Sequence, residues 1–447
     1  MIRSCASVPL RRAIPVLLVS VALGACEEDA TGPVTPDPVA PPAPAPPPPP
    51  PPPVAAQIVP CEGGSADGFP CDRVDLVAQV SVRDLSPGLT PAGPSNFWAT
   101  NDIWGWTDPQ TGVEYALVGR HDGLSIVDLS NPVEPQPIAY LSSHTGTAVW
   151  RDIKVYADQV YVVADGINGH GMQILDLTRL RGLTEFTELQ ADAHYGRLSA
   201  VHNLAINEET GFAYAVGSNS GGDTCGRGLH MIDLSDPMNP SFAGCHAVEG
   251  TGHGPKQGYT HDVQCVVYRG PDAEHSGREI CIGSNADAVV VSDVTEKENP
   301  ETLSIARYAD HGYVHQGWLS EDHRYFYQND ELDEIYGQAT HTRMLVWDLA
   351  DLDDPILAAE HMGPSGAVDH NLYVHGDLIY HSNYAFGVRI VDISDPEHPV
   401  EAGYFDTVPS HNNVTFSGSW SNYPYFESGL FVATSWNEGL FVLRLQK

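Results

Sequence analysis

Positive charge is scarce in this sequence of 447 residues, and lysine occurs only four times. Lys and Arg together number 22 against 58 Asp and Glu, which gives a formal net charge of −36. Nucleic acids and anionic membrane surfaces are polyanions, so a chain this acidic is repelled by both. We therefore expect no nucleic-acid partner, whereas 42% hydrophobic residues exclude a wholly disordered chain.

Common catalytic signatures are also missing. The sequence has no Gly-x-Ser-x-Gly, no His-Glu-x-x-His and no Gly-x-x-x-x-Gly-Lys-Ser/Thr motif. It has no Cys-x-x-Cys pair either, which argues against a thioredoxin-like or zinc-ribbon role. Whether the protein is an enzyme stays open on these grounds.

The N-terminal region predicts export and anchoring. Three arginines precede a short apolar stretch, Ala13 to Ala25, which is too short to span a bilayer and is typical of a signal peptide. The stretch runs into Cys26 as Leu-Gly-Ala-Cys, which looks like a bacterial lipobox. We expect residues 1–25 to be a lipoprotein signal peptide and Cys26 to carry a lipid that is the only membrane contact. The alternative is an ordinary secretory signal followed by a free cysteine.

A proline-rich linker follows the lipidation site. Residues 33–53 hold 14 prolines, a composition that favours polyproline II with a length of about 65 Å. We assign residues 26–60 to this linker and residues 61–447 to one globular domain. Glu27 stands where some bacteria use Asp as an inner-membrane retention signal. The predicted location is therefore the bacterial cell envelope, with the outer membrane or cell surface favoured.

Six cysteines remain outside the signal peptide and lipobox. An even number in an exported chain predicts three disulfides, for which fifteen pairings can be drawn. Pairing between sequence neighbours is the simplest choice, and it joins Cys61 to Cys71, Cys225 to Cys245 and Cys265 to Cys281.

One phrase repeats through the domain and sets the expected fold. It is an apolar, β-branched run that ends in Asp, and an Asp-Pro or Asn-Pro turn closes several copies. The seven copies start near residues 123, 171, 228, 289, 344, 387 and 439, and the six marker aspartates lie 44 to 60 residues apart. Repeats of this length with about four strands each predict an all-β, seven-bladed β-propeller, with six or eight blades as alternatives.

The two ends of the domain look complementary. Residues 75–82 resemble the strand that follows each phrase, although no phrase precedes them, and the last copy at 439–445 has no such following strand. We expect the N-terminal strand to complete the last blade, which would close the ring and remove both open edges.

The chain resembles the choice-of-anchor B proteins, which are exported bacterial propellers built from LVIVD repeats. The resemblance spans roughly residues 61–447 and includes segments 102–106, 225–245, 260–265, 330–334, 340–343 and 369–372. It implies the fold and an exported location, and it implies no established reaction.

A polar pair recurs where each innermost strand should begin, about 20–30 residues before its phrase. Five of the seven pairs contain histidine, and in a closed propeller they should gather near one mouth of the central channel. The candidate residues of this face are Asp102, Arg151, Asp152, His202, His261, Asp262, His315, His370 and His411.

Three interpretations of this face compete. The side chains could be latches that satisfy inter-blade backbone. Alternatively, His202, His261, His315, His370 and His411 could converge on a transition metal, copper or zinc, as a cofactor. A third interpretation is a site for a polar small-molecule or protein ligand.

An acidic loop forms a second candidate. Asp330, Glu331, Asp333 and Glu334 supply oxygen donors that suit calcium, while a solvated loop near Arg343 is the alternative. Taken together, the sequence predicts a lipid-anchored binding or interaction module that works through its histidine-lined face. A metal-dependent enzyme at that face and a purely structural adhesion module are the alternatives.

Overall fold

The computed structural model describes residues 57–90 and 98–447, and the predicted signal peptide, Cys26 and residues 26–56 of the linker lie outside them. Within the described residues, no helix is both long and apolar enough to cross a membrane. Val59 had been assigned to the linker, yet its N–H donates to the carbonyl of Leu76 at 2.8 Å. The ordered domain therefore includes residues just ahead of Cys61.

Seven four-stranded antiparallel sheets form the blades of a β-propeller, which confirms the predicted fold and blade number. Blade 1 consists of β4 (Thr100–Thr107), β5 (Glu114–Arg120), β6 (Gly123–Asp128) and β7 (Gln136–Ser142). Blade 2 consists of β8 (Trp150–Tyr156), β9 (Gln159–Asp165), β10 (Met172–Asp176) and β12 (Ala193–Tyr195). Blade 3 consists of β13 (Asn203–Asn207), β14 (Phe212–Val216), β15 (Leu229–Asp233) and β16 (Ser241–His246). Blades 4 and 5 are β19 (Asp262–Val267), β20 (Glu279–Ser284), β21 (Val289–Asp293) and β22 (Glu301–Ala306); and β23 (Val314–Leu319), β24 (Tyr325–Asp330), β25 (Arg343–Asp348) and β26 (Ile356–Met362). Blades 6 and 7 are β27 (Leu372–His375), β28 (Leu378–Ser382), β29 (Val388–Asp392) and β30 (Val400–Phe405); and β31 (Ser419–Tyr423), β32 (Leu430–Ser435), β33 (Gly439–Leu445) and β3 (Val74–Val80).

The repeated phrase is the third strand of every blade. Its apolar residues are buried between neighbouring sheets, and the Asp that ends it makes a tight turn. In all six copies that have this Asp, the carboxylate accepts a hydrogen bond from the backbone N–H two residues later, at 2.7–2.9 Å. An Asp side chain that bonds backbone two residues on stabilises such a turn, which explains why the phrase ends as it does.

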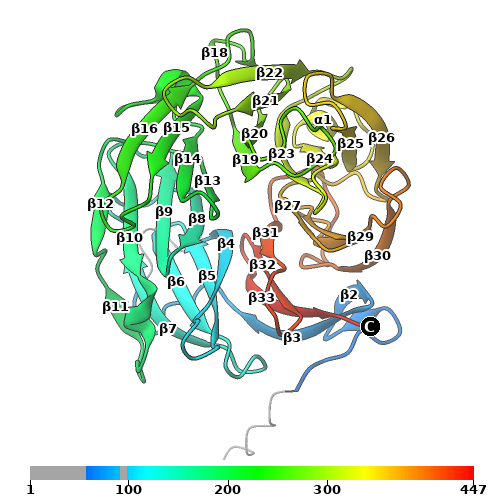
Figure 1. Cartoon of the computed structure of the whole chain (residues 1–447). Coiled ribbons are helices and arrows are strands. Elements are labelled where there is room, and N and C mark those ends of the chain that lie inside the picture. The colour runs from blue at the N-terminus through cyan, green and yellow to red at the C-terminus, as the bar shows by residue number, and fades with distance from the viewer. Residues whose placement is uncertain (1–56, 91–97) are drawn as a thin grey trace, which may run out of the picture. The chain divides into compact units, whose positions relative to one another are not determined.

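The N-terminal strand closes the ring, as predicted. Strand β3 pairs antiparallel with β33 from Val74 opposite Leu445 to Val80 opposite Leu440, so blade 7 combines both ends of the domain. Figure 1 shows β3 in blue beside β33 in red. Because β3 and β33 pair with each other, blade 7 is complete and its two chain ends belong to one continuous sheet.

The remaining elements lie around the blades. Strands β1 (Ser65–Ala66) and β2 (Phe69–Asp72) extend blade 6 through β30, and β11 (Thr187–Leu189) pairs in parallel with β7. The hairpin β17 (Gly252–His253) and β18 (Lys256–Gln257), the short helix α1 (Asp333–Tyr336) and the 3-10 helices η2 (Leu177–Leu180) and η3 (Cys225–Arg227) occupy loops. The three disulfides join Cys61 to Cys71, Cys225 to Cys245 and Cys265 to Cys281, which confirms the predicted pairing.

The inner strands surround the axis of the propeller. Strands β4, β8, β13, β19, β23, β27 and β31 lie closest to the centre in Figure 1. They all run in the same direction relative to their blades, so the residues at their starts gather at one end of the channel and the residues at their ends gather at the other.

Candidate metal centre in the propeller channel

In six of the seven blades, a pair of polar residues lies at the start of the inner strand. Asn101 and Asp102 lie on β4, Arg151 and Asp152 lie on β8, and the four histidine pairs begin at His202, His261, His315 and His370. The channel therefore does bring residues from separate blades together.

The structure does not bring His411 to this position. It lies in the loop between β30 and β31, where its N–H donates to the carbonyl of Val408. The inner strand of blade 7 starts at Ser419, and Trp420 occupies the place equivalent to the histidines. Strand β31 begins 20 residues before the phrase at Gly439, whereas His411 lies 28 residues before it, and both distances fall within the expected range of spacings.

Four histidines form a continuous row along the channel wall. The ring centroids of His202 and His261, of His261 and His315, and of His315 and His370 are each 4.5 Å apart. The ring of Trp420 continues the row at 4.8 Å from that of His370. The equal spacing follows from the fold, because each ring comes from the same position of successive blades.

Hydrogen bonds at Nδ1 fix the tautomer of three of these histidines. Nδ1 of His261 donates to the carbonyl of His315 at 2.8 Å, and Nδ1 of His370 donates to the carbonyl of Trp420. Nδ1 of His315 donates to Oδ1 of Asn329 at 2.9 Å. Because a carbonyl oxygen can only accept, each Nδ1 carries the proton and each Nε2 keeps a lone pair.

Burial also keeps these imidazoles neutral. It lowers the pKa of His261 and His315 well below the usual histidine range, and it lowers the pKa of His370 to about 3. Nδ1 of His202 makes a different contact and lies 3.0 Å from the carboxylate of Asp165. Neutral imidazole with a free Nε2 is the form that binds metal ions.

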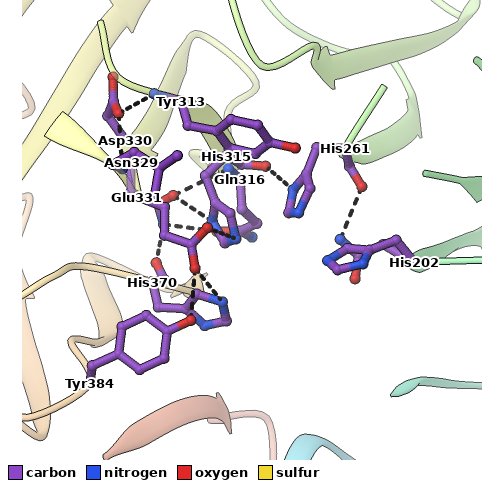
Figure 2. A network of polar contacts seen from close by, with 12 residues as sticks. His202, His261, Tyr313, His315, Gln316, Asn329, Asp330, Glu331, His370 and Tyr384 are labelled. Carbon is purple, nitrogen blue, oxygen red and sulfur yellow. Dashed lines mark hydrogen bonds and ion pairs between the residues drawn. The ribbon is translucent and has the colours of Figure 1, made fainter. Parts of the chain in front are cut away.

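Glu331 completes a compact donor group with two of the histidines. Its Oε2 lies 3.8 Å from Nε2 of His315, and its Oε1 lies 3.7 Å from Nε2 of His370. The Tyr384 hydroxyl donates to Oε1 at 2.7 Å, and burial raises the pKa of Glu331 to about 7. One ligand atom from each of His315, Glu331 and His370 lies within 4.8 Å of the others, as Figure 2 illustrates.

Glu331 was expected among the calcium ligands of the acidic loop and lies instead with the histidines. The sequence feature that could have identified it is its position directly after β24, in the loop between the second and third strands of blade 5. Such loops emerge at the same end of the channel as the starts of the inner strands, so the topology could have joined the two sets.

These residues line a cavity of about 380 Å³, which we call the histidine cavity. One wall carries His202, His261, His315 and His370 with Glu331. The lining also includes the aromatic side chains of Trp150, Trp420 and Trp436. The volume exceeds that of a single ion, so the cavity has room for a ligand beside the donor group.

Asp152 and Asp262 lie at a different cavity. They line a second space of about 330 Å³ toward the other ends of the inner strands, together with Lys154. Lys154 Nζ lies 2.7 Å from Asp152 and 3.7 Å from Asp102, and burial raises the pKa of Asp262 to about 7. Neighbouring residues on an extended strand point to opposite sides, which separates Asp262 from His261 and Asp152 from Arg151.

Three of the predicted residues also act as inter-blade latches. Asp102 accepts from the N–H of Ile153 at 3.1 Å, and Asp152 accepts from the N–H of Leu204 in the following blade. Arg151 donates from Nε to the carbonyl of Arg120 at 2.7 Å and from Nη2 to that of Gly146 at 3.0 Å. The latch interpretation therefore holds for these three residues. In His315 and His370, by contrast, Nε2 keeps a lone pair that can bind a metal ion.

The predicted calcium ligands are divided in the structure. Both carboxylate oxygens of Asp330 already accept, from the N–H groups of Gly312 and Tyr313 and from the Tyr308 hydroxyl. Glu331 faces the histidines. Asp333 and Glu334 are buried on α1.

Comparisons with known proteins support the fold and the repeat. The LVIVD repeat model matches residues 114–138 and 370–407, which include third strands β6 and β29. No curated protein matches the chain. A crystal structure of a protein from Lactobacillus plantarum, solved as a structural genomics target, is similar with a TM-score of 0.50 and 13% identity, covering 75% of this chain and 88% of that one. At this identity the likeness bears on the fold alone, and the chain is a seven-bladed propeller that contains LVIVD repeats.

Proposed function

We propose that this propeller is a binding protein whose histidine cavity takes up a transition-metal ion through His315, His370 and Glu331. The observation that carries the proposal is the convergence of two Nε2 lone pairs and one carboxylate within 4.8 Å at the wall of a cavity. The hydrogen bonds at Nδ1 support it, because metal-binding histidines commonly donate their other N–H to an oxygen.

The spacing of the donors suits an ion of this class. Ligands at 2.0–2.2 Å in tetrahedral geometry are about 3.4 Å apart, whereas the two observed Nε2–O separations are 3.7 and 3.8 Å. All three donor atoms lie within 4.8 Å of one another, so the side chains would have to move closer together on binding an ion. Two imidazoles and one carboxylate suit zinc, and imidazole ligands also suit copper.

A metal-dependent enzyme at the same face is the second candidate. Three protein ligands leave at least one position of the ion open, and catalytic zinc sites share this property. The cavity of about 380 Å³ beside the donors would give a substrate access to that position.

The test is metal analysis of the full chain purified with its disulfides intact. We expect about one zinc or copper ion per chain after reconstitution, and loss of that ion in His315→Ala and His370→Ala with the fold retained by circular dichroism. His411→Ala is the matched control and should bind metal like the wild type. No bound metal in the wild type would eliminate this function and favour a structural module.

We also propose that the propeller is held at the bacterial cell envelope by a lipid on Cys26. The three disulfides support an oxidising compartment. Metabolic labelling with a fatty acid should mark the wild type and should not mark Cys26→Ala. Labelling of neither protein would contradict the anchor.

A further inference from the structure

The second residues of the six polar pairs occupy equivalent positions on their inner strands, and five of them hold the following blade. The side chain of each of these five makes a hydrogen bond to the next inner strand or to its start. The bonded pairs are Asp102 with Ile153, Asp152 with Leu204, Asn203 with His261, Gln316 with Leu372 and Asn371 with Ser421. Bonds of this kind satisfy polar groups between blades, so they account for these five residues without any ligand.

Asp262 is the sixth member of this set, and its carboxylate makes no such bond. Its Oδ1 accepts the N–H of Val263, the next residue of its own strand, at 2.6 Å. Among the residues that the structure describes, no other group hydrogen-bonds to this carboxylate. The bond to blade 5 is made instead by Gln264, whose Oε1 accepts the N–H of Leu319 at 2.8 Å. Asp262 is thus released from the latch role that its equivalents have.

The cavity of about 330 Å³ that Asp262 lines already holds one ammonium group, which belongs to the protein itself. Nζ of Lys154 donates to Oδ1 of Asp152 at 2.7 Å and lies 4.5 Å from the centre of the Trp104 ring. A carboxylate and an aromatic face both attract a cation, the first by its charge and the second by the quadrupole of the ring. We call this space the Asp262 cavity.

The charge of Asp262 is not balanced by a basic side chain of its own. Lys154 is shared between Asp152 at 2.7 Å and Asp102 at 3.7 Å. Arg269, which also lines the Asp262 cavity, pairs with Glu209 at 2.6 Å. The lining therefore has more negative than positive charge when Asp262 is ionised, and it favours a cation over an anion.

Aromatic rings form the apolar part of the same lining. Trp318 and Tyr373 pack edge to face with their centroids 5.0 Å apart, and Tyr373 packs against Trp104 at 5.7 Å. The three rings come from the inner strands of blades 5, 6 and 1. A cavity that combines apolar rings with a few polar groups is typical of a small-molecule site.

We propose that the Asp262 cavity binds a small organic amine in its protonated form. The ammonium group donates to the carboxylate of Asp262, and the apolar body of the amine packs against Trp318 and Tyr373. The arrangement repeats, with a ligand, the contacts that Lys154 makes with Asp152 and Trp104. The site shares no residue with His315, Glu331 and His370, so it does not depend on the metal centre.

Isothermal titration calorimetry with benzylamine tests the proposal. The full chain with its disulfides intact is titrated at pH 8 in the presence of a chelator, so that no transition metal can bind the amine. Burial raises the pKa of Asp262 to about 7, so at this pH its carboxylate is ionised while the amine is still protonated. We expect saturable binding of about one molecule per chain. Asp262→Asn should weaken this binding about 10- to 100-fold, because a hydrogen bond to a charged group is lost.

Controls separate this site from other acidic groups. Asp67→Asn removes an exposed carboxylate and Glu331→Gln changes the histidine cavity, and both should bind benzylamine like the wild type. Trp318→Leu should weaken binding through the apolar contact, and it provides a second variant if Asp262→Asn fails to fold. Benzyl alcohol has the same ring without the charge and should bind the wild type about 10-fold more weakly or less.

Three outcomes would overturn the proposal. They are no saturable binding of benzylamine by the wild type, equal affinities of the wild type and Asp262→Asn, and binding of benzyl alcohol as tight as that of benzylamine.

Discussion

Nε2 of His370 lies 3.7 Å from Oε1 of Glu331, although the two residues belong to different blades. His370 precedes the inner strand of blade 6, and Glu331 follows the second strand of blade 5. The Tyr384 hydroxyl holds the same carboxylate oxygen at 2.7 Å. Three loops thus contribute to the position of this carboxylate beside His370.

Removing the hydrogen-bond acceptor of Nδ1 of His315 should weaken metal binding, although no proposed metal ligand is changed. Asn329→Ala deletes the oxygen that holds Nδ1 of His315, so the ring can rotate or change tautomer. We expect affinity for zinc to fall about 10- to 100-fold in competition titrations with a chromophoric chelator. Asn203→Ala is the control, because it removes an inter-blade bond to the carbonyl of His261 and leaves His315 untouched. Equal affinities for both variants would contradict the positioning role of Asn329.

Copper binding should be visible through Trp420. Its ring lies 4.8 Å from that of His370, so a paramagnetic copper ion at the site should quench its fluorescence. Quenching should saturate near one equivalent and should shrink clearly in Trp420→Phe. Trp106→Phe, at the other end of the inner strand β4, should keep the full amplitude. Undiminished quenching after Trp150, Trp420 and Trp436 of the same cavity are all changed to Phe would place copper elsewhere.

Asp262 should make stability fall as pH rises. Its folded pKa is about 7, whereas an unfolded Asp titrates near 3.9, so between these values the folded protein retains a proton that the unfolded chain has lost. The free energy of unfolding therefore decreases from about pH 4 to pH 7. In urea denaturation, the free energy of unfolding of Asp262→Asn should rise relative to that of the wild type by about 2 kcal/mol as the pH increases from 5 to 8.

The exposed Asp67 provides the comparison for that experiment. Asp67→Asn should follow the wild-type pH profile within about 0.5 kcal/mol. A profile for Asp262→Asn that runs parallel to the wild type would mean that Asp262 ionises normally in the folded state.

The closing strand should be a sensitive point of stability. Leu76 on β3 is 5% exposed and packs among residues of blades 6 and 7. Leu76→Ala should lower the free energy of unfolding by about 2–4 kcal/mol, because it leaves a cavity where the two ends of the domain meet. Gln79→Ala on the same strand, whose side chain is exposed, should cost less than about 1 kcal/mol in the same urea titration. Similar losses for both would argue against tight packing of β3.

Much of the fold could be read from local patterns. The seven phrases correspond to seven third strands because apolar, β-branched runs with terminal Asp turns depend on neighbours in sequence. Cys61 and Cys71 could be paired because short loops bring them together. Blade 7 was harder, because His411 and Trp420 both lie at distances from the phrase that suit the start of an inner strand, and His411 carries the histidine.

Only part of the candidate site could be predicted from the sequence. Histidine at the start of successive inner strands predicted a shared location, and His202, His261, His315 and His370 do form one row. Nothing in the spacing separated the histidines from Asp152 and Asp262, because that depends on which way each side chain points. The partnership of Glu331 with His370 was equally hidden, since it crosses a blade boundary.

The sequence by itself determined the repeat, the number of blades and the strand that closes the ring, because these follow from periodic burial and from turn-forming residues. Tertiary structure alone decided which polar side chains became latches, which kept a free donor atom, and which carboxylates were buried together. Those outcomes depend on the direction of each side chain and on neighbours from other blades, and neither is encoded in the spacing along the chain.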